Sequence, residues 1–211
     1  MNIMAELNVG KVYIIHYKKA VNRKEHMLNF LNSNNIKNYE FRDFYQREDL
    51  SQELFDKYTN FNSSNGWKPG YDRIYACTAI EHIETYKDIL NNGLDNKWYL
   101  ILEDDSFPVD NFVEELNNYL ANVPEDAEYL DINCFWKMES PNMWERKNGT
   151  RLTMSYLVNK ECCRKILSTI IPVETSIDCE LNKHFKIHDL KVYWSNKPLV
   201  YFNDAVIPST L

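Results

Sequence analysis

Three consecutive carboxylates, Glu103, Asp104 and Asp105, directly follow an apolar run at residues 98–102. A short apolar run of this kind predicts a buried β-strand, so the acids stand where the strand leaves its sheet. Carboxylates this close repel one another unless a cation, a proton or open water offsets their charge. Carboxylate oxygens are ligands that Mn²⁺ and Mg²⁺ prefer, and substrate phosphates often share such an ion. The alternative is an exposed turn whose acids cap the next helix.

The composition is that of a globular protein and argues against two kinds of partner. Of the 211 residues, 44% are hydrophobic and 26% are charged, which is ordinary for a soluble domain. The formal net charge of −7 argues against nucleic-acid binding, since phosphate contacts need clustered Lys and Arg. No run approaches the roughly 18 apolar residues that span a bilayer, and no secretory core is present. The five cysteines form no CxxC pair, so we expect reduced thiols and a cytoplasmic protein.

Glycine is scarce, with only five in the chain. None of them falls in a GxGxxG or GxxxxGK pattern, so neither of these glycine-rich phosphate-binding loops is available. A bound nucleotide would therefore have to be held by side chains or by a metal ion. This absence makes the acid cluster the leading candidate for a phosphate site.

Strand-like and helix-like segments alternate along the chain. Apolar runs predict strands at residues 12–15, 39–44, 98–102, 129–133, 152–158, 190–193 and 199–202. Helical spacing predicts helices at residues 23–32, 50–58, 75–91, 112–120, 160–170 and 176–184, with polar loops at 60–71 and 138–148. The alternation predicts an α/β fold with a mostly parallel sheet covered by helices on both faces. We expect a single domain over residues 1–211, with its ligand outside the carboxyl ends of the strands.

Several separated segments resemble glycosyltransferase family 25, which includes lipopolysaccharide- and collagen-type galactosyltransferases. In chain order they are VYIIHY at 12–17 with Arg23, ACTAIEH at 76–82, LILEDD at 100–105, TMSYLV at 153–158, Ile177-Asp178 after Pro172, and Leu199-Val200 after Pro198. Only LILEDD matches its motif unchanged. The matches keep the order of the family and span roughly residues 11–202.

The resemblance implies a glycosyltransferase-A-type, Rossmann-like fold and inversion at the anomeric carbon. It also implies a UDP-sugar donor carrying a hexose (galactose or glucose) and a hydroxyl acceptor on a glycan or glycosylated polymer, as in lipopolysaccharide biosynthesis. In this interpretation Asp105, with Asp104 and Glu103, holds Mn²⁺ or Mg²⁺ on the diphosphate. Glu103 or Asp104 would alternatively hold the ribose hydroxyls.

Three further residues are expected at the nucleotide because they fall in matching segments. They are His16, which stands where the family has Asn, together with Arg23 and His82. Arg23 and His82 each have a plainer interpretation. Arg23 would solvate the start of a helix, and His82 would be a hydrogen-bonded core residue on the apolar stripe of its helix.

Asp178 is the expected catalytic base. Inverting transfer in one displacement needs a carboxylate that takes the proton of the acceptor hydroxyl. Asp178 lies on a predicted short helix after Pro172, in a different segment from the expected metal ligands. The alternative is an acid that complements the dipole at the N-terminus of a helix, which is our interpretation of Glu180.

Aromatic and basic residues near the polar loops allow two interpretations. Aromatic side chains there stack on sugars or bases, or fold over the core as a lid; these residues are Trp67, Tyr71, Trp136 and Trp144. The basic residues nearby are predicted to lie on a solvated surface; they are Arg146, Lys147 and Arg151. Cys163 falls on an apolar helical stripe and is predicted to be a core thiol.

Departures from the family motifs keep a second hypothesis open. They fall at His16, Ala20, Ala76, Glu81 and Leu152. A catalytically inactive relative that binds a glycan or a protein would show such changes. A nucleotidyl or phosphoryl transferase that uses the same acids is a third hypothesis, because metal–diphosphate chemistry looks alike in sequence.

Overall fold

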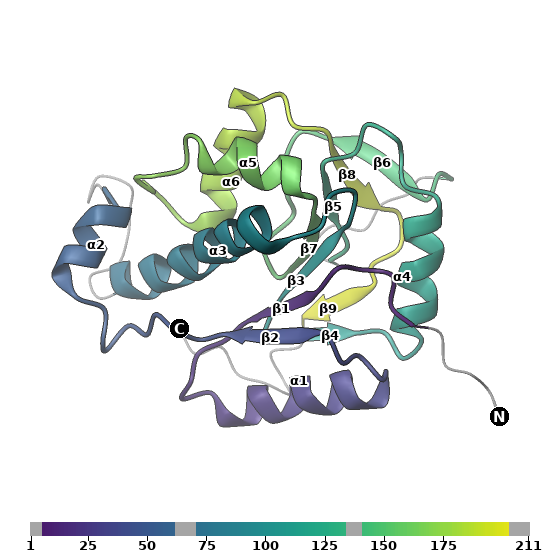
Figure 1. The fold of residues 1–211 in the computed structure, drawn as a ribbon, viewed down its shortest axis with the longest axis horizontal. Helices are drawn as coiled ribbons and strands as arrows, with labels where there is room; N and C mark the ends of the chain where they lie inside the picture. The colour runs from purple at the N-terminus through teal and green to yellow at the C-terminus, as the bar shows by residue number, and fades with distance from the viewer. Residues whose placement is uncertain (1–5, 62–70, 134–140, 203–211) are drawn as a thin grey trace.

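The computed structural model describes residues 6–61, 71–133 and 141–202. Seven strands form one sheet in the order β2-β1-β3-β7-β5-β8-β6, and β4 pairs with β9 in a small second sheet (Figure 1). The strands are β1 (Val12–Ile15), β2 (Tyr39–Arg42), β3 (Tyr99–Glu103), β4 (Ser106–Pro108), β5 (Tyr129–Asp131), β6 (Trp144–Lys147), β7 (Ser155–Val158), β8 (Val192–Ser195) and β9 (Val200–Phe202). The helices are α1 (Val21–Ser33), α2 (Gln52–Tyr58), α3 (Asp72–Asn92), α4 (Phe112–Ala121), α5 (Lys160–Leu167) and α6 (Ile177–Ile187).

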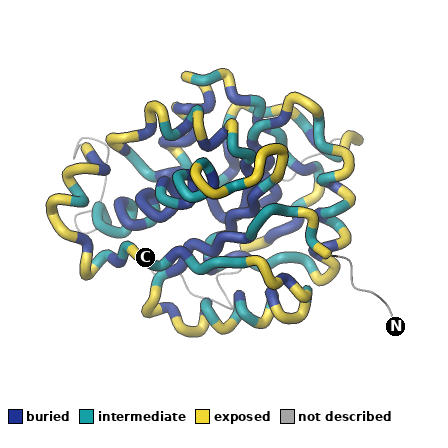
Figure 2. Tube along the Cα trace, in the orientation of Figure 1, coloured by how far each residue is buried: buried dark blue, intermediate teal, exposed yellow. Residues whose placement is uncertain are grey.

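Helices cover both faces of the seven-stranded sheet. α3, α5 and α6 pack on one face, in a core with Tyr13 and Ile101. α1 and α4 pack on the other face, in a core with Ile14 and Leu102. Successive residues of a strand point to opposite faces, so all four residues of β1 are buried, as are the middle of α3 and the central strands (Figure 2). The predicted α/β class with helices on both faces is confirmed.

The strand directions bring the acids at the end of β3 against the start of β7. β1 pairs in parallel with β2 and β3, and β5 with β8, whereas β7 is antiparallel to β3 and β5 and β6 is antiparallel to β8. The sheet is therefore more mixed than expected, because β5 leads to β7 through the strand β6 and not, in the described part of the chain, through a crossover helix. Ser155 pairs with Leu102, so residues 152–154 lie beside the acids.

The loop predicted at residues 138–148 is wrong in its second half, which forms the edge strand β6. The sequence of β6, Trp-Glu-Arg-Lys, has a single apolar residue, so no periodicity signals a strand. Its strand geometry comes from pairing with β8. Trp144 is a buried core residue. Its indole N–H donates to the carbonyl of Tyr119 at 2.9 Å, and the two rings pack edge to face.

A buried ion pair anchors the segment before β7. The Nε of Arg151 donates to Asp131 Oδ1 at 2.9 Å and its backbone amide donates to Oδ2 at 2.7 Å, and neither side chain is exposed. The predicted solvated position of Arg151 is thus wrong, because its partner lies on β5, beyond the reach of a local pattern. Arg146 is well exposed, as predicted. The ion pair fixes the chain two residues before Thr153.

Two smaller expectations concern helices. Cys163 is buried in α5 with a free thiol, which confirms the predicted core position. Within the described ranges, no helix combines the length and the apolar character needed to cross a bilayer.

Candidate active site

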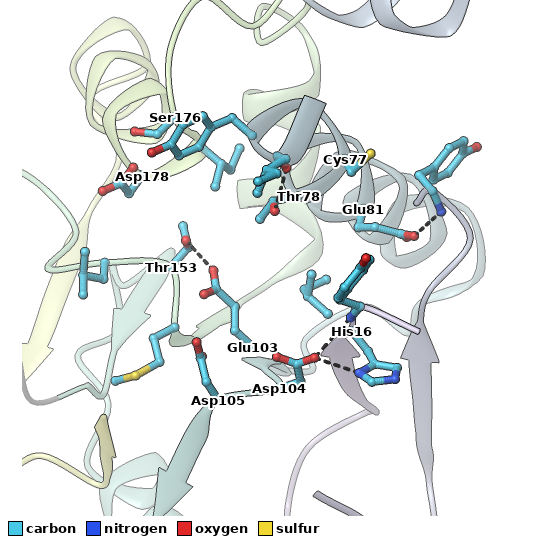
Figure 3. Close-up of a pocket in the computed structure, with 18 of the residues that line it drawn as sticks. His16, Cys77, Thr78, Glu81, Glu103, Asp104, Asp105, Thr153, Ser176 and Asp178 are labelled. Carbon is cyan, nitrogen blue, oxygen red and sulfur yellow. Dashed lines mark hydrogen bonds and ion pairs between the residues drawn. The ribbon is translucent and has the colours of Figure 1, made fainter. Parts of the chain in front are cut away.

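A cavity of about 400 Å³ opens where β1 and β3 end (Figure 3). Its walls come from the ends of these strands, the first half of α3, residues 152–154, and the start of α6. Open α/β sheets bind ligands in this position. The lining includes every predicted site residue except His82, namely His16, Arg23, Glu103, Asp104, Asp105 and Asp178.

Asp104 is buried and both of its carboxylate oxygens are engaged. Oδ1 accepts a hydrogen bond from Arg23 at 2.8 Å. Oδ2 lies 2.7 Å from Nδ1 of His16 and accepts from the amide of Tyr17 at 3.1 Å. Asp104 accordingly points toward His16 rather than into the open cavity (Figure 3). It ties the residues after β1 and the start of α1 to the end of β3.

Asp105 presents an unengaged oxygen. Its Oδ2 accepts from Arg23 at 3.3 Å, whereas its Oδ1 is buried and has no hydrogen-bond partner in the described part of the chain. Burial, and next the charge of Glu103, raises the pKa of Asp105 well above its usual range. A buried acceptor without a partner costs free energy, so Oδ1 is a favourable contact point for a cation or a donor group.

Glu103 is held from two sides. Its Oε1 accepts from the hydroxyl of Thr153 at 2.7 Å and lies 3.4 Å from Nε2 of His82. His82 has no exposed surface and does not line the cavity. The structure therefore places His82 behind Glu103, where it contacts the carboxylate and not the open cavity.

Asp178 lies on the opposite side of the cavity from the acids of β3, in the first turn of α6 (Figure 3). It is half-buried, and its charge adds to burial in raising the pKa of the neighbouring Tyr75. Glu180, in the same turn, is fully buried and bonded to His184 and the amide of Glu174, so it holds the helix in place. Asp178 alone of the two lines the cavity.

Sequence reasoning missed Glu81 as a cavity residue and noted it only as a departure from a motif. Its Oε1 accepts from the amide of Tyr45 at 2.6 Å, while its Oε2 lies 4.0 Å from Nε of Arg42 and makes no hydrogen bond among the described residues. Burial raises the pKa of Glu81 to about 7. The signal in the sequence that could have identified Glu81 was its position next to His82 on α3, a helix that is buried on most sides.

The residues present fit a divalent ion only if the ion brings other ligands with it. Among residues 6–61, 71–133 and 141–202, no group of three His, Cys, Asp or Glu is placed to hold a metal. Asp104 is taken by His16, Tyr17 and Arg23, which leaves the buried Oδ1 of Asp105 and the second carboxylate oxygen of Glu103. Mg²⁺ is commonly bound by one or two carboxylates, with waters and substrate phosphates completing its shell. The donor set fits that pattern, with Asp104 held by its protein partners and Asp105 available to the ion.

Of the four aromatic residues predicted near the polar loops, the two that the structure describes, Tyr71 and Trp144, do not line the cavity. Trp67 and Trp136 lie outside the described residues, and Tyr71 stands at the start of α3, with its ring 6.4 Å from that of Tyr75. The aromatic residues in the cavity lining are Tyr17, Tyr45, Tyr75 and Phe202.

Comparison with known proteins relates the chain to glycosyltransferases. A family model described as glycosyltransferase family 25 (LPS biosynthesis protein) matches residues 9–143. The chain is 24% identical over 177 residues to the procollagen lysyl hydroxylase and glycosyltransferase of Acanthamoeba polyphaga mimivirus, and the match covers 76% of this chain. It covers 20% of the viral protein, so the chain spans about a fifth of the length of that relative. Mouse xyloside xylosyltransferase 1 in its apo form matches with a TM-score of 0.49 and 12% identity, over 97% of this chain and 90% of that one.

The family model covers well over half of the chain, and its matched residues include those at the ends of β1 and β3 that line the cavity. The chain belongs to glycosyltransferase family 25.

Proposed function

We propose that this chain is an active, metal-assisted, inverting transferase that moves a hexose from a UDP-sugar to a hydroxyl of a glycan or glycosylated polymer. The hexose is galactose or glucose. The observation that carries the proposal is that one cavity brings together Glu103–Asp105, at and directly after the end of β3, and Asp178 from α6. Inverting transfer needs two groups of this kind on opposite sides of the sugar, one at the leaving group and one at the incoming hydroxyl.

We assign Asp105 and Arg23 to the diphosphate side of the cavity. Arg23 lies between Asp104 and Asp105 and offsets part of their charge. A bound Mn²⁺ or Mg²⁺ would be held by Asp105 and would stabilise the negative charge on the departing diphosphate. His16, fixed by Asp104, is assigned with Arg23 to nucleotide contacts.

Asp178 is assigned as the base on the acceptor side. As the acceptor oxygen forms its bond to the anomeric carbon, the bond from that carbon to the diphosphate oxygen breaks and the nucleoside diphosphate leaves with the electron pair. Asp178 takes the proton of the acceptor hydroxyl. Attack from the face opposite the leaving group inverts the anomeric centre. The cavity walls of Leu152, Met154 and Ile177 would keep water from competing with the acceptor.

The test combines a binding screen with a comparison of two variants. UDP-galactose and UDP-glucose are added with and without Mn²⁺, and a ligand that binds only the folded protein raises the melting temperature. We expect a rise that needs Mn²⁺ in the wild type and is lost in Asp105→Asn. Asp110→Asn is the matched control, because Asp110 is an exposed acid outside the cavity lining, and it should behave as the wild type.

The outcomes separate the rival functions. Full transfer activity in the presence of a chelator would contradict the metal-assisted version. Calorimetric binding of a glycan with no binding of either UDP-sugar, with or without Mn²⁺, would favour an inactive binding module. A product whose mass has grown by a nucleotide and not by a hexose would favour a nucleotidyl transferase.

A further inference from the structure

A chain of buried polar side chains runs from the core to Glu103. The hydroxyl of Tyr86 lies 2.6 Å from that of Tyr156, and the hydroxyl of Tyr156 lies 2.7 Å from Nδ1 of His82. Nε2 of His82 then lies 3.4 Å from Oε1 of Glu103. Tyr86, Tyr156 and His82 have no exposed surface. Buried polar groups this far from solvent are stable only when their hydrogen bonds are made within the protein.

Glu103 is the last member of this series of hydrogen bonds, and it sets the direction of each of them. Oε1 of Glu103 is an acceptor, since it accepts from the hydroxyl of Thr153, so Nε2 of His82 is the donor to the same oxygen. Nδ1 of His82 is then the acceptor for the hydroxyl of Tyr156, whose oxygen in turn accepts from Tyr86. In this order His82 carries its proton on Nε2, and its ring is also stacked on that of Tyr156, with centroids 5.7 Å apart.

We propose that His82 is a positioning residue, which acts through Glu103 and is itself held by Tyr156 and Tyr86. Together with Thr153 it fixes Oε1 of Glu103, and this leaves Oε2 facing the cavity (Figure 3). A fixed carboxylate oxygen at this place accepts a hydrogen bond from a hydroxyl of the bound sugar nucleotide. The proposal rests on the proposed function and deepens it, because it assigns a residue that determines how tightly the donor is recognised.

The experiment is a double-mutant cycle on donor affinity, measured by calorimetry with UDP-galactose or UDP-glucose in the presence of Mn²⁺. Tyr156→Phe removes the hydroxyl that holds His82, and Glu103→Ala removes the group that His82 positions. In metal sites, loss of an outer partner of a ligand typically costs about 10- to 100-fold, so for the comparable role of Tyr156 we expect Tyr156→Phe to weaken donor binding about 10-fold. In the Glu103→Ala background the same change should have no further effect.

Tyr129→Phe is the matched control. Tyr129 is buried and its ring is stacked on that of Tyr156 at 4.9 Å, but its hydroxyl contacts Thr150 and not His82. It loses a buried hydroxyl in the same core and should leave donor affinity unchanged. An equal loss in Tyr129→Phe, or an equal loss of affinity from Tyr156→Phe with and without Glu103, would overturn the positioning role.

A second measurement does not depend on the variants or on any donor. Nitrogen-15 NMR of the histidines of the wild-type protein should show His82, assigned by its contacts to the rings of Tyr156 and Tyr86, with its proton on Nε2. A proton on Nδ1 instead would contradict the proposed bond order. A wild-type protein that shows this tautomer but binds neither UDP-sugar would refute the proposed donor and leave the bond order standing.

Discussion

Glu81→Gln should make the protein clearly more stable at pH 8 and only slightly more stable at pH 5. Glu81 is 2% exposed, and burial raises its pKa from 4.5 to about 7. The carboxylate is therefore costly to ionise in the folded protein. Gln has nearly the same shape, keeps an oxygen to accept from the amide of Tyr45, and carries no charge to bury.

The sign and size of the effect follow from the two pKa values. Between pH 4.5 and about 7 the folded state binds more protons than the unfolded state, so stability is highest below this window and falls as the pH rises through it. Each tenfold change in acidity is worth about 1.4 kcal/mol, so the full penalty above pH 7 reaches about 3 kcal/mol. The attraction of Arg42, whose Nε lies 4.0 Å from Oε2 of Glu81, lowers this pKa and is therefore already contained in the penalty. For a chain of this size, about 3 kcal/mol corresponds to roughly 6–12 °C in melting temperature.

The assay is thermal unfolding of both proteins at pH 5, 6.5 and 8. The difference in melting temperature should grow with pH in favour of Glu81→Gln. Glu84→Gln is the matched control from the next turn of α3, because Glu84 is paired with Lys87 and Tyr58. These contacts outweigh burial and lower the pKa of Glu84, so its variant should lose stability at pH 8. A Glu81→Gln protein that is no more stable than the wild type at pH 8 would refute the reasoning.

Three further predictions concern the base, the buried ion pair and a helix cap. Asp178→Asn should lower kcat by about 10²- to 10⁴-fold with donor affinity unchanged in calorimetry, and near-normal turnover would remove Asp178 as the base. Arg151→Met leaves Asp131 buried without its partner and should lower the free energy of unfolding by about 3–5 kcal/mol in denaturant. Arg146→Met, which changes an exposed side chain, should lower it by less than about 1 kcal/mol, and equal losses would contradict the argument. Asn159→Ala removes the acceptor for the amide of Cys162 at the start of α5 and should cost about 1 kcal/mol, and an unchanged unfolding midpoint would show that the cap is dispensable.

The parts of the fold that the sequence predicts well are those whose burial leaves a local pattern. The strand before Glu103 is an apolar run because both of its faces are covered, and α3 shows helical spacing over most of its length. The acids at the end of β3 and Asp178 were singled out by residue type and by motif, and the structure brings them to one cavity.

The parts that were missed depend on partners far away in the chain. Arg151 reads as a surface residue until Asp131 is placed beside it, and β6 reads as a loop until it pairs with β8. The engagement of Asp104 by His16 and Arg23 likewise joins residues more than eighty positions apart. No local pattern indicates that this carboxylate is occupied while a buried oxygen of its neighbour Asp105 has no partner among the described residues.

The side chains on the two edge strands of the large sheet, β2 and β6, influence whether this protein aggregates at high concentration. An exposed strand edge invites the edge of a second copy, and repeated pairing of this kind builds insoluble fibres. β6 carries Glu145, Arg146 and Lys147 in succession, and β2 carries Glu40, which is partly exposed. Pairing with the edge of a second copy would remove water from these charged side chains, so the charges on both strands oppose aggregation.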